Sequence, residues 1–445
     1  RQVTSRRHLK ALKWLILLLP LFVCNVLLLS VESNPAVQKI YLEGVPHTTK
    51  NGKRLSAYDP KHSFFMIGSW GVPESRVYRG VDYRWKHLVD AGYNTVWPWA
   101  MGGYTTEKQL QQAARYNLQV IVMRRPLDAS LERIKLSPNL LGIVWQDEPL
   151  INFGIESERQ QKELLSFRDY RKAVKGVLPD LPVFVNTASW MIGNGRTHWI
   201  NWHKAGDISC HDNYVIWPVT KSLNLGSYGT EKNGIADATS LAVKVNKEAK
   251  PVWLVVGAFE ANHPPTVRFP FRYPTPMQLR GMVYTGIIHG ATGITYYAWD
   301  SNVTRFGVAP VEQRKVPGRP SATPIQAINA NALWKTISVV NSELLELTAE
   351  ILSPTVNLGY AVSYTGDAVT EYPLRTLLKP HRDGGYVLFT VNMDNTVITG
   401  NFHFPSMLKS AEPMFENGSA FSLGEDKRSF MVTYEPFEVH VVRLN

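Results

Sequence analysis

Short apolar runs alternate with longer amphipathic stretches through the first two thirds of the chain. Continuous apolar strands separated by helices indicate a parallel sheet that is covered on both faces. Eight strands are expected at residues 63–69, 95–99, 119–123, 142–146, 183–187, 207–211, 252–259 and 293–299. Helix-like segments lie between them, among them residues 83–91, 107–116, 158–176, 236–248 and 277–289.

Eight strand–helix units over about 280 residues match the size of a (β/α)₈ barrel. An open, doubly wound sheet is the alternative fold. That fold would carry a glycine-rich phosphate-binding loop after an early strand, and the sequence has no such loop. We therefore expect an α/β (TIM) barrel over residues 61–350.

The pattern changes near residue 353 to short segments in which apolar and polar residues alternate. This period of two is typical of strands with one buried face. The segments are residues 355–363, 385–392, 401–404, 430–434 and 438–444, and turn-forming Gly, Asp and Asn residues separate them. Residues 351–445 are thus predicted to form an all-β, sandwich-like domain.

A nearly continuous apolar run occupies residues 11–32, long enough for a membrane-spanning helix of about 20 residues. A basic cluster at residues 6–13 predicts that residues 1–10 are a cytoplasmic tail. A cleaved signal peptide is the alternative, but no small-residue cleavage site follows the run. We expect a single-pass membrane anchor in the lipid bilayer, a linker at residues 33–60, and folded domains outside the cytoplasm.

Composition and charge remove several classes of function. The net charge of +11 includes five cations in the first thirteen residues, where no acid lies, so the remainder carries only +6. There is no basic cluster interleaved with aromatic residues, which argues against a nucleic-acid partner. The two cysteines and twelve histidines show no metal-ligand spacing, and no metal or organic cofactor is implied.

The ends of the fourth and seventh strands carry the candidate chemistry, because a barrel has its active site at the carboxyl ends of its strands. The fourth strand leads into Asp147-Glu148-Pro149, and the seventh ends in Phe259-Glu260. Glycosidic cleavage needs two carboxyl groups, one of which acts as an acid. Burial beside Trp145 would raise the pKa of Glu148, as a general acid requires. The structural alternative is that each glutamate caps a helix or pairs with an arginine.

These positions resemble clan A of the retaining glycoside hydrolases, whose acid/base and nucleophile are glutamates after strands four and seven. The resemblance covers roughly residues 61–345. It implies Glu148 as acid/base, Glu260 as nucleophile, and a poly- or oligosaccharide substrate. The residues expected to contact sugar lie at strand ends, some by this resemblance and some as aromatic platforms: Trp97, Trp99, Trp145, Asp147, His211, Tyr214 and Trp299.

Two departures from the family leave alternatives open. The family has Asn where this chain has Asp147, and Arg on strand two, a charge that Arg124 or Arg125 could supply here. An Asp-Glu pair after strand four also resembles hexosaminidases that use substrate-assisted catalysis. There the Asp orients a 2-acetamido group, the Glu is the acid, and Glu260 would only bind. A third possibility is a catalytically inactive, glycan-binding subunit of an envelope assembly.

Overall fold

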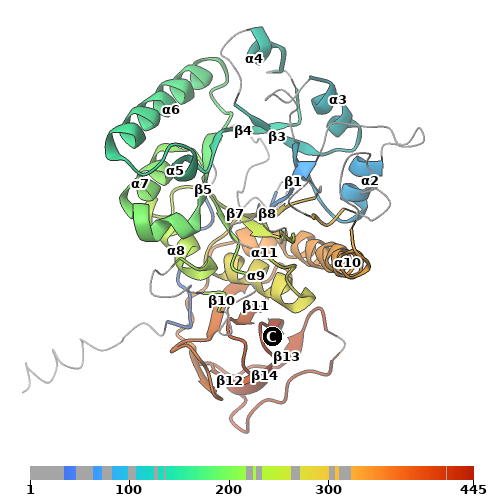
Figure 1. Ribbon diagram of the computed structural model, residues 1–445. Coiled ribbons are helices and arrows are strands. Elements are labelled where there is room, and N and C mark those ends of the chain that lie inside the picture. The colour runs from blue at the N-terminus through green and yellow to red at the C-terminus, as the bar shows by residue number, and fades with distance from the viewer. Residues whose placement is uncertain are drawn as a thin grey trace, which may run out of the picture.

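The computed structural model describes residues 35–46, 64–72, 83–98, 107–124, 129–134, 137–216, 224–226, 233–261, 271–299, 306–309, 322–416 and 418–445. Its centre is a closed barrel of eight parallel strands in sequence order (Figure 1). The strands are β1 (Met66–Val72), β2 (Thr95–Pro98), β3 (Gln119–Met123), β4 (Leu140–Asp147), β5 (Val183–Ala188), β6 (Ser209–Asn213), β7 (Val252–Gly257) and β8 (Gly293–Tyr297). The predicted barrel is confirmed.

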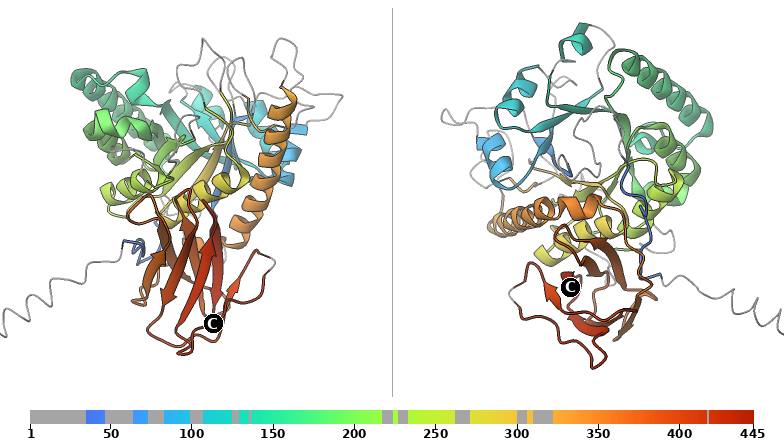
Figure 2. Two further views of the ribbon diagram at one scale, coloured as in Figure 1. Left: turned by 60° about the horizontal axis from the view of Figure 1, so that its bottom comes forward. Right: turned by 180° about the vertical axis from the view of Figure 1, so that it is seen from behind.

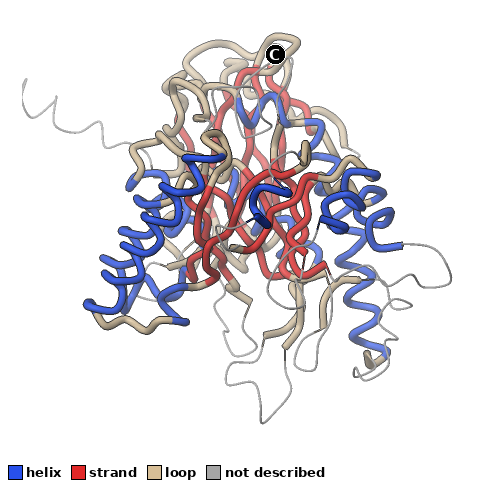
Figure 3. The backbone as a smooth tube through the Cα atoms, turned by 90° about the horizontal axis from the view of Figure 1, so that it is seen from above, coloured by secondary structure: helices blue, strands red, loops and turns tan. Residues whose placement is uncertain are grey.

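Helices surround this barrel, with the strands at the centre and helices on either side (Figure 3). They are α2 (Tyr83–Asp90), α3 (Glu107–Arg115), α4 (Ala129–Ile134), α5 (Pro149–Asn152), α6 (Ser157–Val177), α7 (Ile192–Ala205), α8 (Ile235–Val245), α9 (Pro276–Ile288), α10 (Pro324–Glu346) and α11 (Thr348–Leu352). A short 3₁₀ turn, η1 (Ser189–Met191), links β5 to α7. Strand β8 closes the barrel against β1, with Met66 opposite Gly293 and Trp70 opposite Tyr297.

Strand β6 begins two residues later than the sequence pattern predicts. Asp207, which the pattern included in the strand, lies just before it. Its Oδ2 accepts a hydrogen bond from the Val183 backbone N–H at 2.9 Å, its Oδ1 pairs with Arg171, and its own N–H donates to the Val183 carbonyl at 3.0 Å. The regular strand ends at Asn213 and therefore includes Asp212.

Large aromatic side chains fill the interior of the barrel. Trp97, Phe184 and Trp253 are buried there and contact one another edge to face, at centroid distances of 5.7 and 5.3 Å. A Cβ atom at Gly293 would lie only 2.7 Å from the Trp253 ring. Glycine at this position therefore makes room for the tryptophan, and the interior is a packed core rather than a channel.

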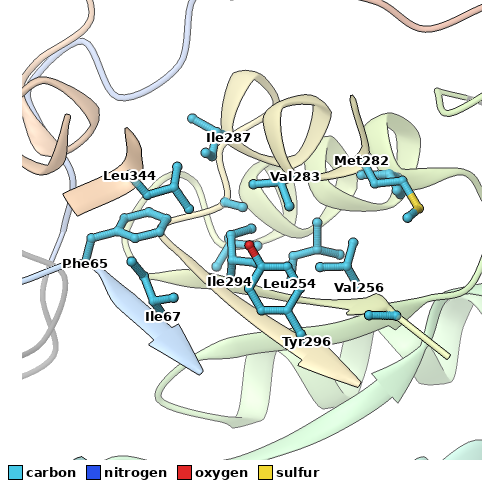
Figure 4. Close-up of a cluster of buried hydrophobic side chains, with 14 of the residues drawn as sticks. Phe65, Ile67, Leu254, Val256, Met282, Val283, Ile287, Ile294, Tyr296 and Leu344 are labelled. Atoms are coloured by element: carbon cyan, nitrogen blue, oxygen red, sulfur yellow. The ribbon is translucent and has the colours of Figure 1, made fainter. Parts of the chain in front are cut away.

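A second core lies between the outer faces of the strands and the helices. Figure 4 shows side chains of β7 and β8 meeting those of α9. The labelled residues are Phe65, Ile67, Leu254, Val256, Met282, Val283, Ile287, Ile294, Tyr296 and Leu344. Burial of this apolar surface fixes the strands that carry the candidate site.

The C-terminal part is all-β, as predicted. One antiparallel sheet has the order β10-β11-β15-β13 and a second has β14-β12-β9, and the two share a buried core. The strands are β9 (Ala361–Thr365), β10 (Leu374–Pro380), β11 (Tyr386–Asn392), β12 (Ile398–His403), β13 (Ala411–Pro413), β14 (Ser429–Tyr434) and β15 (Val439–Leu444). This domain packs beside α9 (Figure 2), where Arg280 donates to the Val439 carbonyl at 2.6 Å and pairs with Glu343.

Residues 35–46 contact both the β domain and the barrel. The Gln38 N–H donates to the Thr376 carbonyl at 2.9 Å, and the Tyr41 hydroxyl donates to the Gly290 carbonyl at 3.1 Å. The predicted membrane anchor, residues 11–32, lies outside the described residues. Within the described ranges, no helix has both the length and the apolar character needed to cross a bilayer.

Trp145 gives a test of the packing that holds β4. It is 3% exposed and lies between β4 and the α6/α7 layer, 5.5 Å from the Phe167 ring and 5.8 Å from the Trp202 ring. Trp145→Ala should lower the free energy of unfolding by about 3–5 kcal/mol, because it leaves a cavity in this layer. Urea denaturation measures the change.

Trp190→Ala is the matched control, because that side chain is 48% exposed on η1 and should cost less than about 1 kcal/mol. Equal losses in the two variants would contradict the packing role of Trp145.

Candidate active site

Three neighbouring strands bring acidic and amide side chains together at their carboxyl ends. Asp147 ends β4, Asn186 lies in β5 and Asp212 in β6. Asn186 Nδ2 donates to Asp147 Oδ1 at 2.9 Å and to Asp212 Oδ1 at 3.1 Å. The Cys210 thiol donates to Asn186 Oδ1 at 3.4 Å. Because an amide NH₂ has two hydrogens, Asn186 uses both to hold the two acids in place.

Glu148 follows Asp147 in a backbone conformation that is unusual for a residue with a side chain. Its φ and ψ are 44° and 62°, in the left-handed region. Its N–H donates to the Asn186 carbonyl at 2.8 Å, and its own carbonyl accepts from Ile151 and Asn152 at 3.0 Å. Such a conformation is costly and occurs at functional sites, where neighbouring bonds hold it. Here it forms the sharp turn from β4 into α5.

The Glu148 carboxyl group interacts with that of Asp212. Asp212 Oδ2 is buried and accepts no hydrogen bond from a donor among the described residues. Burial, and then the charge of Asp147, raise the pKa of Glu148 to about 7, which the interaction with Asp212 opposes. Burial raises the pKa of Asp147 to about 6, against the bond from Asn186.

Asp212 is the most strongly affected of the three acids. Burial, followed by the charges of Glu148 and Asp147, raises its pKa well above the usual range. The three carboxyl groups therefore share protons at neutral pH rather than all ionising. Among the described residues, no group of three or more His, Cys, Asp and Glu side chains is arranged to hold a metal ion.

Tyr214 also reaches this cluster. Its ring stacks on Tyr297 at a centroid distance of 5.5 Å and meets the Phe259 ring edge to face at 5.2 Å. Burial and then the charge of Asp212 raise its pKa well above the usual value, so its hydroxyl stays protonated. The predicted substrate residue Tyr214 thus lies beside the acids, and its contact with sugar stays a prediction.

Glu260 has a different set of partners. It lies after β7 and is 8% exposed. Its Oε1 accepts a hydrogen bond from Gln326 Nε2 at 2.8 Å, and its backbone pairs with Phe306. Gln326 belongs to the capping box at the start of α10. These contacts tie Glu260 to α10, and its role as nucleophile stays a prediction.

The structure buries four of the other residues that were predicted to contact sugar. The Trp97 ring lies tilted against that of Trp70 inside the barrel, with ring centroids 4.4 Å apart. Trp145 packs under α6 and α7, and Trp299 is 2% exposed. His211 Nδ1 bonds Ser189 Oγ at 2.8 Å, and burial lowers its pKa to about 3. These positions give the four side chains packing roles, and contact with a sugar is untested for each.

Further predictions concern residues near the rim of the barrel. Trp99 and Arg125 lie outside the described residues. The Arg124 guanidinium lies 5.2 Å from the centre of the Trp145 ring, on the helix side of β4. Among the tryptophans that the structure describes, Trp190 is the exposed one, on the turn directly after β5.

Sequence reasoning missed Asn186, Asp212 and Trp190. A signal for Asp212 exists, because it lies two residues after the inward-facing Cys210, and alternate residues of a strand share a face.

Comparisons with known proteins agree with this architecture. No protein-family model and no curated protein matches the sequence. A solved structure described as a glycoside hydrolase matches over 92% of this chain and 98% of its own, with a TM-score of 0.51 and 13% identity. The chain has the fold of glycoside hydrolases. A family 39 glycoside hydrolase from the gut symbiont Bacteroides cellulosilyticus WH2 matches over 90% of this chain and 83% of its own (TM-score 0.51, 12% identity).

The raised pKa of Glu148 predicts a stability that depends on pH. An acid whose pKa is higher in the folded state stabilises the fold only while protonated. This contribution is complete below about pH 4.5 and is lost as the pH rises through about 7. Glu148→Gln removes this titration. Relative to wild type, the variant should gain about 1–3 kcal/mol of unfolding free energy between pH 4.5 and pH 8.

Chemical denaturation at both pH values measures the difference. Glu158→Gln, the same substitution at an exposed position of α6, controls for the loss of one surface charge. If the difference in unfolding free energy between Glu148→Gln and wild type is the same at both pH values, the pKa of Glu148 is not raised in the folded protein.

Proposed function

We propose that this protein is a glycoside hydrolase in which Glu148 is the general acid. One observation supports this most directly: the Glu148 carboxyl group is buried at the carboxyl end of β4, where burial and then the charge of Asp147 raise its pKa to about 7. A general acid is most effective when its pKa lies near the working pH. The barrel places it where enzymes of this fold carry out their chemistry.

The proposed reaction is a double displacement with retention. Glu148 donates its proton to the glycosidic oxygen while Glu260 attacks the anomeric carbon, and a glycosyl-enzyme ester forms. Water, deprotonated by Glu148, then releases the sugar. The bond from Gln326 to Glu260 supports this role, since it fixes one carboxylate oxygen.

A second candidate is substrate-assisted hydrolysis of N-acetylated aminosugars. The observation that favours it is that Asp147, Asp212 and Tyr214 lie around Glu148. Glu260 does not belong to this group, and its hydrogen bond comes from Gln326 of α10. In this mechanism Asp147 orients the 2-acetamido group, whose carbonyl oxygen attacks the anomeric carbon. Glu148 remains the acid in both mechanisms.

Variants of the two glutamates test the proposal. A panel of defined oligosaccharides and cell-surface glycans, incubated with residues 34–445, identifies a substrate. Glu148→Gln should then lower kcat by about 10²–10⁴-fold, because it cannot donate the proton. Glu260→Gln should abolish turnover if it is the nucleophile. Circular dichroism checks that both variants fold.

The pattern of losses separates the mechanisms. The substrate-assisted mechanism replaces double displacement if three results are found together. The protein cleaves only substrates with a 2-acetamido group, Glu260→Gln keeps this activity, and Asp147→Asn loses it. Full activity in Glu148→Gln overturns the proposal. Glycan binding without cleavage by the wild-type protein would instead indicate an inactive binding subunit.

We further propose that residues 11–32 anchor the enzyme in a membrane, with its domains outside the cytoplasm. The apolar run and the basic residues that precede it support this. The full chain should therefore stay with membranes through high-salt and alkaline washes, whereas residues 34–445 should be released. Protease added outside intact cells or sealed membrane preparations should digest the domains. Extraction of the full chain by salt alone would count against the anchor.

A further inference from the structure

Asp212 occupies an unusual place for an acidic side chain. It lies in β6, two residues beyond the inward-facing Cys210, and is 1% exposed. Asn186 Nδ2 holds its Oδ1 at 3.1 Å. Its Oδ2 accepts no hydrogen bond from a donor among the described residues. The carboxyl group of Asp212 interacts with that of Glu148. One oxygen is thus fixed, and the carboxyl group is oriented for an interaction with the acid.

The titratable groups around Asp212 disfavour a negative charge there. Asp147 and Glu148 face it from the end of β4, and Cys210 and Tyr214 lie near it on its own chain segment. Strand β5 contributes the neutral amide of Asn186. Two charged carboxyl groups in contact, out of water, would repel strongly. A neutral Asp212 beside an ionised Glu148 removes this repulsion and forms a hydrogen bond.

We infer that Asp212 is a neutral positioning residue whose carboxylic O–H donates a hydrogen bond to the Glu148 carboxylate. The inference rests on the proposed role of Glu148 as general acid. In the chemical step the Glu148 proton passes to the glycosidic oxygen. The electron pair of the breaking carbon–oxygen bond goes to the same oxygen, which leaves as an alcohol. Asp212 keeps its proton and stabilises the carboxylate that Glu148 has become.

A pair of substitutions separates a neutral donor from a charged neighbour. Asp212→Asn keeps a donor, its NH₂ group, without any charge. Asp212→Leu keeps a similar volume without a donor. The protonation of Glu148 is followed in the full chain by its pH-dependent modification with a water-soluble carbodiimide and glycine ethyl ester, located by peptide mass spectrometry. This measurement needs no substrate.

The midpoint pH of the Glu148 modification should rise by about one to two pH units in Asp212→Leu, because the Glu148 carboxylate loses a hydrogen bond. In Asp212→Asn it should stay within about half a unit of wild type, since the amide replaces the donor. If Asp212 is instead a carboxylate, both variants lose a negative charge and both midpoints fall. A fall in both, or no change in Asp212→Leu, overturns the inference. If Asp212→Leu does not fold, Asp212→Asn still decides, because a fall of its midpoint by more than about half a pH unit overturns the inference.

A matched control separates this effect from general loosening of the fold. Asp394 is equally buried, in the β domain, where it accepts hydrogen bonds from the N–H groups of Val369 and Thr370. Asp394→Asn should lower the melting temperature without moving the Glu148 midpoint.

Once a glycan that the protein cleaves has been identified, kcat can be compared with that of the wild type. It should fall about 10–100-fold in Asp212→Leu and less than about tenfold in Asp212→Asn. Absence of any cleaved glycan would count against the proposed hydrolase, while the modification experiment would still decide the role of Asp212.

Discussion

The candidate site depends on one amide group that bridges two acids. Asn186 donates one hydrogen to Asp147 and the other to Asp212, and Cys210 fixes the orientation of the amide through its oxygen. This arrangement requires β4, β5 and β6 to be neighbours in a fixed register, which the closed barrel supplies. The left-handed turn at Glu148 is held from the same strand, through the carbonyl of Asn186. The geometry of three acids therefore follows from a single position in β5.

Such a cluster opposes folding, because burial of acids is unfavourable once they ionise. The rest of the molecule offsets this cost with two apolar cores. Tryptophan and phenylalanine fill the barrel interior, and the outer faces of β7 and β8 pack on α9. Trp97 and Trp145, which the sequence offered as sugar platforms, belong to these cores. Rigid packing around an unfavourable charge arrangement is a common feature of active sites.

The sequence predicted the barrel, the β domain and the position of Glu148, because each depends on a periodic pattern or on the end of a strand. It did not predict the partners of Glu148. An amide such as Asn186 leaves no periodic signal, and Asp212 lies one residue beyond the predicted end of the sixth strand at residue 211. The burial of Trp145 and His211 depends on which face of a strand meets the helices. A strand that is apolar on both faces does not reveal this.

The contact between Asp212 and Glu148 limits the mechanism. In a retaining glycosidase the acid and the nucleophile are about 5–5.5 Å apart, because the anomeric carbon and its leaving oxygen must fit between them. A hydrogen bond between the carboxyl groups of Asp212 and Glu148 leaves no such space, so Asp212 does not fit the role of nucleophile beside the proposed proton donor Glu148. In the mechanisms that we propose, the attacking group is therefore either Glu260, whose Oε1 accepts a hydrogen bond from Gln326 of α10, or a carbonyl oxygen of the substrate. In both proposals Asp212 would act on the reaction only through the proton of Glu148.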